Sequence, residues 1–311
     1  MLARVAENLY WMGRYLERAE CNMRYIREEF FSTLEAPMTP HRDYVIRSIL
    51  FLGATNTDSF DHIKDAIVWK NAIFDMTNSN SIISNINQVR ENARGIRNTI
   101  SSELWESINK WYIYCKDREA EIFTLKEIND FSEDMTNHLA MIKYSMVNTQ
   151  LHNLVWHFLN IGIMLERTVS LSKILRSKIS DYNILSNQGK DKSMLIYQWT
   201  ILLKSVGGYD VHQTVARTKL MSPETMFPLL IANELFPRSL KYSISKCASH
   251  LKRVGQYIQV DSEKFNMTDT LIEQINQINQ DIKEQLVIHT LEQIQEQMSE
   301  YHFAIHSEFF E

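Results

Sequence analysis

Proline and glycine are scarce in this chain of 311 residues, which contains 5 prolines and 8 glycines. So few chain breakers allow few tight turns and favour long, uninterrupted elements, which indicates helices rather than sheets. Cysteine is scarce as well, because the three cysteines lie far apart and have no CxxC spacing. They give no disulfide framework and fit a reducing, cytoplasmic compartment.

Long apolar runs and an excess of one charge are also missing. No window approaches 18 uncharged apolar residues, and the N-terminal segment MLARVAENLYWMGRYLERAE carries a charge every few positions. We therefore expect neither a signal peptide nor a membrane span. The chain has 33 Lys and Arg against 38 Asp and Glu, for a net charge of −5. Because it has no global basic field, we expect no nucleic acid and no membrane as partners.

Motifs of the common cofactor sites and nucleophiles do not occur. The sequence has no Walker loop, no GxGxxG and no GxSxG, so we expect no cofactor. His302 and His306 have the spacing of a zinc-binding pair but lack the glutamate of HExxH, so we expect a solvent-facing pair and no metal. We expect His152 and His157 to be packing residues, and the tryptophans on apolar stripes to lie in the core: Trp105, Trp111, Trp156 and Trp199.

Hydrophobic spacing is helical along nearly the whole chain. In the first helix, expected to end near Phe31, apolar residues recur at intervals of three, four and seven. No segment alternates with period two, so the sequence predicts an all-α multi-helix bundle of about ten helices in one domain, 1–311. We expect a linker at 180–193. Further helices are expected over 41–53, 59–75, 128–147, 150–179 and 236–259, together with one that ends near Ile100 and one that begins at 102. An amphipathic C-terminal helix is expected over about 267–305.

One stretch occurs twice. Residues 10–26 read YWMGRYLERAECNMRYI and residues 159–175 read LNIGIMLERTVSLSKIL. Aligned without a gap, the glycine, leucine, glutamate and arginine of Gly-x-x-Leu-Glu-Arg coincide, always 149 positions apart. The repeat predicts two related helical halves, about 1–127 and 128–260, each built around one long helix.

Arginines and glutamates form the candidate site. On the first helix a charged face that includes Trp11 lies opposite the apolar stripe, and Arg90, Arg94 and Arg97 share a face of a later helix. Such faces are either solvated ion-pair networks and struts between the halves, or the lining of an anion site. The site hypothesis expects these side chains to meet in one central region: Arg14, Glu17, Arg18, Arg90, Arg94, Glu166 and Arg167.

Several segments resemble the bacterial alpha-E domain proteins, helical proteins named for their Glu-Arg motif. They are MLARVAENLYWMGRYLERAE, FDMTNSNSIISNINQVRENARGIRNTISSELWESIN, WHFLNIGIMLERT, YQWTILLKS and LFPRSLKYSI, and their order covers the chain to about residue 260. Three positions depart from the family pattern: Ile163 replaces an arginine, Val169 an acid and Asn80 a proline. The resemblance implies a role beside a circularly permuted ATP-grasp ligase of peptides or amides, often with a transglutaminase-like protein.

Two functions remain open on the sequence. In the first, the chain is an accessory or binding protein without catalysis of its own, which recognises an anionic peptide or partner for the ligase. In the second, it is a stand-alone amide- or peptide-processing enzyme that uses Glu17 or Glu166 as acid/base. A carboxylate between cations has a lowered pKa and is a poor general acid, which favours the first function.

Overall fold

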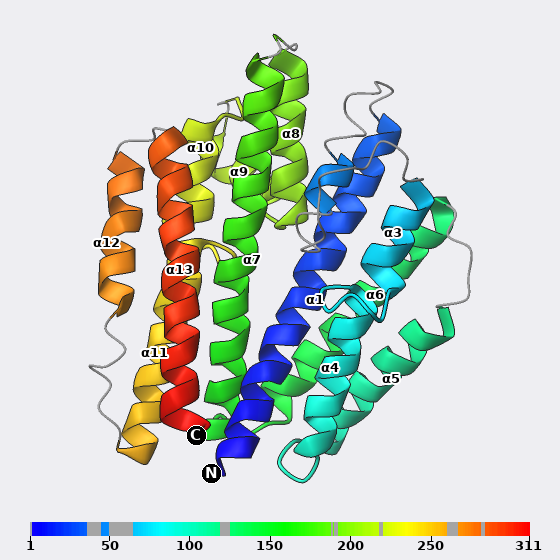
Figure 1. Cartoon of the computed structure of the whole chain (residues 1–311), viewed down its shortest axis with the longest axis vertical. Helices are drawn as coiled ribbons and strands as arrows, with labels where there is room; N and C mark the ends of the chain where they lie inside the picture. The colour runs from blue at the N-terminus through cyan, green and yellow to red at the C-terminus, as the bar shows by residue number, and fades with distance from the viewer. Residues whose placement is uncertain are drawn as a thin grey trace. The chain divides into compact units, whose positions relative to one another are not determined.

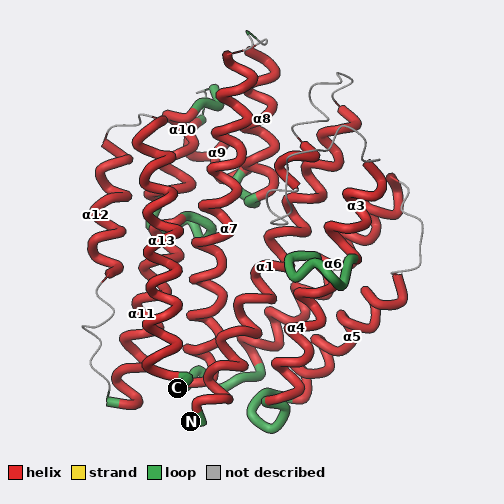
Figure 2. Tube along the Cα trace, viewed as in Figure 1, coloured by secondary structure: helices red, strands yellow, loops and turns green. Residues whose placement is uncertain are grey.

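The computed structural model describes residues 2–35, 45–49, 65–118, 125–187, 189, 192–217, 220–259, 267–280 and 284–311. Every regular element in these ranges is helical, which confirms the predicted all-α fold (Figures 1 and 2). Contacts divide the chain into two compact units, Met1–Glu166 with Glu308–Glu311, and Arg167–Ser307. The division falls inside one long helix and not near residue 127, and the predicted repeat halves stay a prediction. No helix in the described ranges is long and apolar enough to cross a membrane.

The first unit is a bundle around α1. Its helices are α1 (Ala3–Glu35), α3 (Asp65–Phe74), α4 (Ile82–Gly95), α5 (Ser102–Arg118), α6 (Leu125–Asn148) and the first part of α7 (Leu154–Asn187). α4 runs antiparallel to α1, since Gly95 lies against the side chain of Asn8 whereas Asn80, just before α4, accepts a hydrogen bond from Asn22. This pairing places α4 beside residues 8–22, in the N-terminal part of α1 (Figure 1).

Serine caps and apolar stripes explain these helices. The Ser81 and Ser101 hydroxyls accept hydrogen bonds from the backbone N–H groups of Ser84 and Leu104, so each caps the first turn of its helix. α4 ends at Gly95 rather than near Ile100, because residues 96–99 form turns and glycine is a poor helix residue. The buried stripes come from α1, α4, α5 and α6: Leu9, Met12, Leu16, Ile82, Ile86, Val89, Leu104, Ile108, Met135 and Ile142.

Two of the four tryptophans placed in the core by the sequence are buried there. Trp111 is 0% exposed and its Nε1–H donates to Met135 Sδ at 3.0 Å, and Trp199 is 2% exposed. Trp105 and Trp156 are only half-buried, which corrects the prediction for them. His152 is exposed rather than packed inside, and its ring stacks on Trp156 with the centroids 4.1 Å apart.

The second unit contains the last part of α7 and the helices that follow it. These are α8 (Lys192–Ser205), α9 (Tyr209–Ala216), α10 (Pro223–Phe227), the π-helix η1 (Pro228–Ala232), α11 (Leu240–Ile258), α12 (Met267–Gln280) and α13 (Glu284–Phe309). α13 lies along α7, where Arg176 donates to Glu292 at 2.7 Å and to Gln295 at 3.1 Å. The π-helix continues directly from α10 and was not foreseen in the sequence.

Some expected helix ends differ from the structure. α7 continues to Asn187 through most of the predicted linker 180–193, because Asp181 and Leu185 are one turn apart and both buried. The C-terminal helix is described as α12 and α13, and residues 281–283 between them lie outside the described residues. The expected helix 41–53 and the start of the one at 59–75 also lie largely outside them.

Candidate functional site

The two copies of the repeated motif lie on two long helices that touch at the repeated glycines. A Cβ atom added to Gly13 would come within 3.0 Å of the carbonyl oxygen of Leu159, and one added to Gly162 would come equally near that of Tyr10. Tyr10 and Leu159 are themselves 149 positions apart. Only glycine allows two helix backbones to approach so closely, so the glycines fix the crossing point.

The crossing is reciprocal at the next atoms as well. An added Cβ on Gly13 would lie 3.1 Å from the backbone nitrogen of Ile163, and one on Gly162 would lie 3.1 Å from that of Arg14. Arg14 and Ile163 are again equivalent positions of the repeat. The two helices therefore meet with a local two-fold symmetry in which each copy of the motif makes the same backbone contacts to the other.

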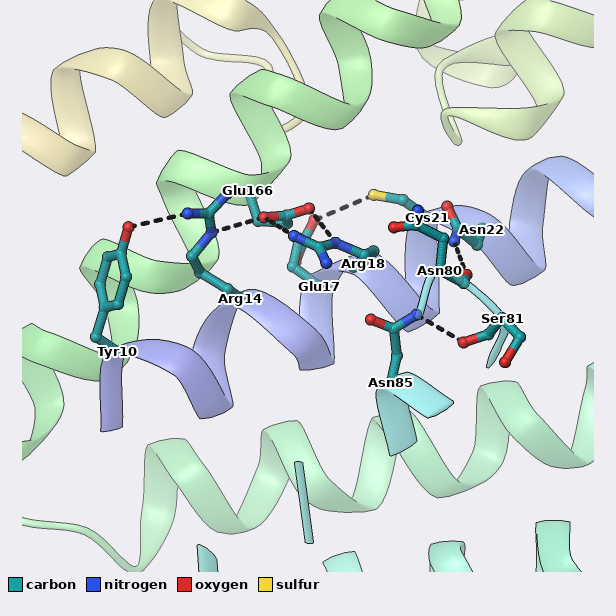
Figure 3. A network of polar contacts seen from close by, with 10 residues as sticks. All are labelled: Tyr10, Arg14, Glu17, Arg18, Cys21, Asn22, Asn80, Ser81, Asn85 and Glu166. Atoms are coloured by element: carbon teal, nitrogen blue, oxygen red, sulfur yellow. Dashed lines mark hydrogen bonds and ion pairs between the residues drawn. The ribbon is translucent and has the colours of Figure 1, made fainter. Parts of the chain in front are cut away.

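One turn beyond the crossing, two arginines of α1 hold one glutamate of α7. Arg14 Nε donates to Glu166 Oε2 at 2.7 Å, and Arg18 donates to both carboxylate oxygens, from Nε at 2.6 Å and from Nη2 at 3.0 Å (Figure 3). Arg14 Nη1 also donates to the Tyr10 hydroxyl at 3.2 Å. We call Arg14, Arg18 and Glu166 the Arg–Glu–Arg triad, and its members' side chains are 10%, 20% and 3% exposed.

Aromatic rings of α1 cover the two guanidinium groups. The Arg14 group lies 5.1 Å from the ring centroid of Trp11 and 5.7 Å from that of Tyr10, and the Arg18 group lies 5.5 Å from Tyr15. Trp11 and Tyr15 stack on each other with the centroids 5.4 Å apart. Cation–π contacts of this kind add to the ion pairs and shield them from water. The tryptophan on the charged face of α1 is thus a cover for the triad.

The triad is fully charged at neutral pH. Burial alone would raise the pKa of Glu166, but the charges and hydrogen bonds of Arg18 and Arg14 outweigh it and lower the pKa to about 2. Burial would likewise lower the pKa of Arg14, yet Glu166 and Tyr10 together raise it above its ordinary value. Both carboxylate oxygens accept hydrogen bonds from guanidinium groups. Glu166 is therefore ionised at neutral pH and carries no proton to give to a substrate.

Glu17, the repeat equivalent of Glu166, has different surroundings. It is 1% exposed, and the thiol of Cys21 lies 3.7 Å from its Oε1, one turn along α1 (Figure 3). The position equivalent to Arg14 is Ile163, an apolar side chain that is 5% exposed. The local two-fold symmetry of the backbone is therefore not matched by the chemistry of the side chains.

Other polar contacts attach α1 to its neighbours near the triad. Glu20, 3% exposed, accepts from Arg24 on the same helix and from Lys143 of α6. Asn22 Nδ2 donates to the carbonyl oxygen of Asn80 at 3.0 Å, directly before α4 (Figure 3). Sequence reasoning missed the contact of Glu20 with Lys143, because 123 positions separate the two residues and Lys143 belongs to no motif.

The arginines of α4 do not join the triad in the described structure. Arg90 Nε donates to Asn109 Oδ1 of α5 at 2.8 Å, and its Nη1 lies 3.0 Å from Glu91 Oε1. Arg94 pairs with the other oxygen of Glu91, and its side chain is 66% exposed. The Arg97 group lies 5.1 Å from the ring centroid of Trp105. The prediction grouped Arg90 and Arg94 with the triad, whereas the structure places them on the surface between α4 and α5.

Arg167, the remaining predicted residue, belongs to the second unit. Its Nη1 donates to the carbonyl oxygen of Pro237 at 3.0 Å, just before α11. In that unit Pro237 lies in the turn before the helix, and the Ser239 hydroxyl caps α11 by accepting from the N–H of Tyr242 at 3.0 Å. Arg167 thus contacts the start of α11.

No group of three or more His, Cys, Asp or Glu within the described ranges could hold a metal ion. His302 and His306 lie on α13 with their ring centroids 6.3 Å apart. The three cysteines are buried thiols, and burial raises the pKa of the Cys115 thiol.

One of three comparisons with known proteins found a match. Residues 1–310 match a family model described as a predicted alpha-helical domain with a conserved ER motif. Comparisons with curated proteins and with solved structures gave no match. The Glu-Arg dipeptides at 17–18 and 166–167 both lie on the crossing helices. The chain belongs to the alpha-E family.

Proposed function

We propose that this protein is a helical accessory or binding protein that acts with an ATP-grasp ligase of peptides or amides. In this role it recognises an anionic peptide or partner protein for the ligase, and a transglutaminase-like protein completes the system. The resemblance to alpha-E proteins supports the ligase as partner, and the exposed arginines support an anionic ligand. We place the system in the bacterial cytoplasm, in keeping with the reduced cysteines.

One observation carries the proposal. Arg90 and Arg94 on α4 share a single carboxylate, that of Glu91, and Arg97 lies in the turn that follows the helix. Among the described residues Arg97 makes a ring contact but no ion pair. In the triad, by contrast, both guanidinium groups are bonded to one buried carboxylate. Arginines that are exposed and only partly neutralised suit an external carboxylate, whereas those of the triad already have theirs.

The alternative, a stand-alone enzyme with Glu166 as acid/base, has little support in this geometry. A carboxylate with a pKa of about 2 stays ionised at neutral pH, so it is a poor general acid and only a weak base. Its two oxygens are also bonded to Arg14 and Arg18. A catalytic version of the proposal would have to use Glu17.

Co-purification with the ligase tests the proposal. The alpha-E protein and the ATP-grasp protein encoded beside it would be co-expressed with a tag on one of them, and the product would be analysed with and without the alpha-E protein. We expect a stable complex and a product that depends on it. Equal product in its absence, with no complex, would refute the accessory role. Loss of product in Glu17→Gln with the complex intact would support the enzyme instead.

A further inference from the structure

The arginines of α4 and of the turn that follows it form a surface together with residues of α5. We call Arg90, Arg94, Arg97, Trp105, Asn109 and Tyr112 the α4–α5 arginine surface. The Arg90 group lies 4.7 Å from the ring centroid of Tyr112 and 5.9 Å from that of Trp105, and the Arg97 group lies 5.1 Å from Trp105. Trp105 is therefore shared by two cations.

Two contacts fix the guanidinium plane of Arg90. Its Nε is bonded to Asn109 at 2.8 Å and one Nη to Glu91 at 3.0 Å, while the ring of Tyr112 lies beside it. An arginine held in this way loses little side-chain entropy when it binds a ligand. Arg94 and Arg97 are exposed, so their donors point to where a ligand can reach them.

The charge of this surface is not balanced. Glu91 neutralises one of the three arginines in total, because its two oxygens are shared by Arg90 and Arg94. The whole chain, however, carries a net charge of −5, and on α5 the exposed Glu103 and Glu106 stand against the exposed Lys110. The net negative charge of the chain disfavours a long polyanion such as nucleic acid, whereas a short acidic peptide contacts the arginines alone.

We propose that the α4–α5 arginine surface binds an acidic polypeptide segment of a partner protein or substrate. This inference rests on the proposed function and names the face and the ligand chemistry for it. Along α4, which rises about 1.5 Å per residue, Arg90 and Arg94 are about 6 Å apart, and Arg97 lies in the turn that follows the helix. The spacing of Arg90 and Arg94 fits carboxylates two residues apart in an extended chain or one turn apart in a helix.

A labelled octaglutamate peptide is the probe for this surface, with octaglutamine and a single-stranded DNA oligomer as the comparison ligands. Binding would be followed by fluorescence anisotropy at low ionic strength, where surface charges are least screened. The test variant is Arg97→Glu. Its matched control is Arg253→Glu on α11, which reverses the charge of another exposed arginine whose hydrogen bond goes to Gln256.

Wild-type protein should bind octaglutamate and not octaglutamine. Arg97→Glu should weaken the binding by on the order of tenfold or more, and Arg253→Glu should change it by less than about twofold. No binding by the wild type, or equal losses in both variants, would overturn the proposal. The proposal would also be overturned if the protein bound the DNA oligomer as tightly as octaglutamate and Arg97→Glu abolished the binding of DNA. The ligase is absent from this assay. A negative peptide result therefore overturns only the α4–α5 binding surface, and a negative co-purification result overturns only the partnership with the ligase.

Discussion

Removing the charge of Glu166 should destabilise the first unit strongly. In Glu166→Gln the side chain keeps its size, but Arg14 and Arg18 lose the carboxylate that they share, while their side chains are 10% and 20% exposed. The pKa of Glu166 is lowered from its ordinary value of 4.5 to about 2. A tenfold change in proton affinity is worth about 1.4 kcal/mol, so the lowering corresponds to about 3 kcal/mol. Breaking a buried ion pair from one side costs a similar amount, about 3–5 kcal/mol.

Glu91→Gln is the matched control for this change. Glu91 also pairs with two arginines, Arg90 and Arg94, but its side chain is 34% exposed, so water replaces the lost contacts. Urea unfolding followed by circular dichroism would give the free energy of unfolding of each variant. We expect a loss of about 3 kcal/mol for Glu166→Gln and of less than about 1 kcal/mol for Glu91→Gln. Equal small losses would refute the claim that the buried triad stabilises the helix crossing.

Three further predictions follow from the same contacts. Gly13→Ala and Gly162→Ala should each lower the free energy of unfolding by several kcal/mol (~3), because the new Cβ meets a backbone carbonyl, whereas Gly95→Ala meets only an asparagine side chain and should be nearly neutral. The pKa of Glu166 is lower in the folded state than in the unfolded state, so its stabilising effect is complete above pH 4.5 and is lost as the pH falls to about 2. Urea titrations at several pH values should show this loss of stability in the wild type and not in Glu166→Gln. Glu91→Gln should bind octaglutamate more tightly than the wild type, by several-fold (~3), in the anisotropy assay.

The sequence was sufficient for the fold class and for the core of the triad. Scarce glycine and proline and continuous helical spacing predicted an all-α chain. The repeat predicted two long helices with matching motifs, and α1 and α7 are those helices. The site hypothesis expected Arg14, Arg18 and Glu166 in one region, and in the structure Glu166 accepts hydrogen bonds from both arginines.

The rest depended on packing that no local pattern contains. The spacing predicted that Arg90, Arg94 and Arg97 share a helical face, but α4 ends before Arg97, and the neighbouring helices set the direction of its faces. α4 buries Val89 and Ala93, so Arg90, about 100° further round the helix, contacts Asn109 of α5 instead of the triad. The end of α7 was misjudged for a similar reason, because polar residues on the outer face concealed the buried Asp181 and Leu185.

The triple variant Arg14→Met, Arg18→Met and Glu166→Met tests most directly whether the triad is structural rather than a binding site. Apolar side chains of similar size often replace a buried ion cluster without loss of stability. The measurement is product formation by the ligase in the presence of this variant, with its unfolding curve taken in parallel. We expect an intact fold, co-purification with the ligase and product as in the wild type. An intact fold with loss of both complex and product would contradict the structural role and make the triad part of the functional site.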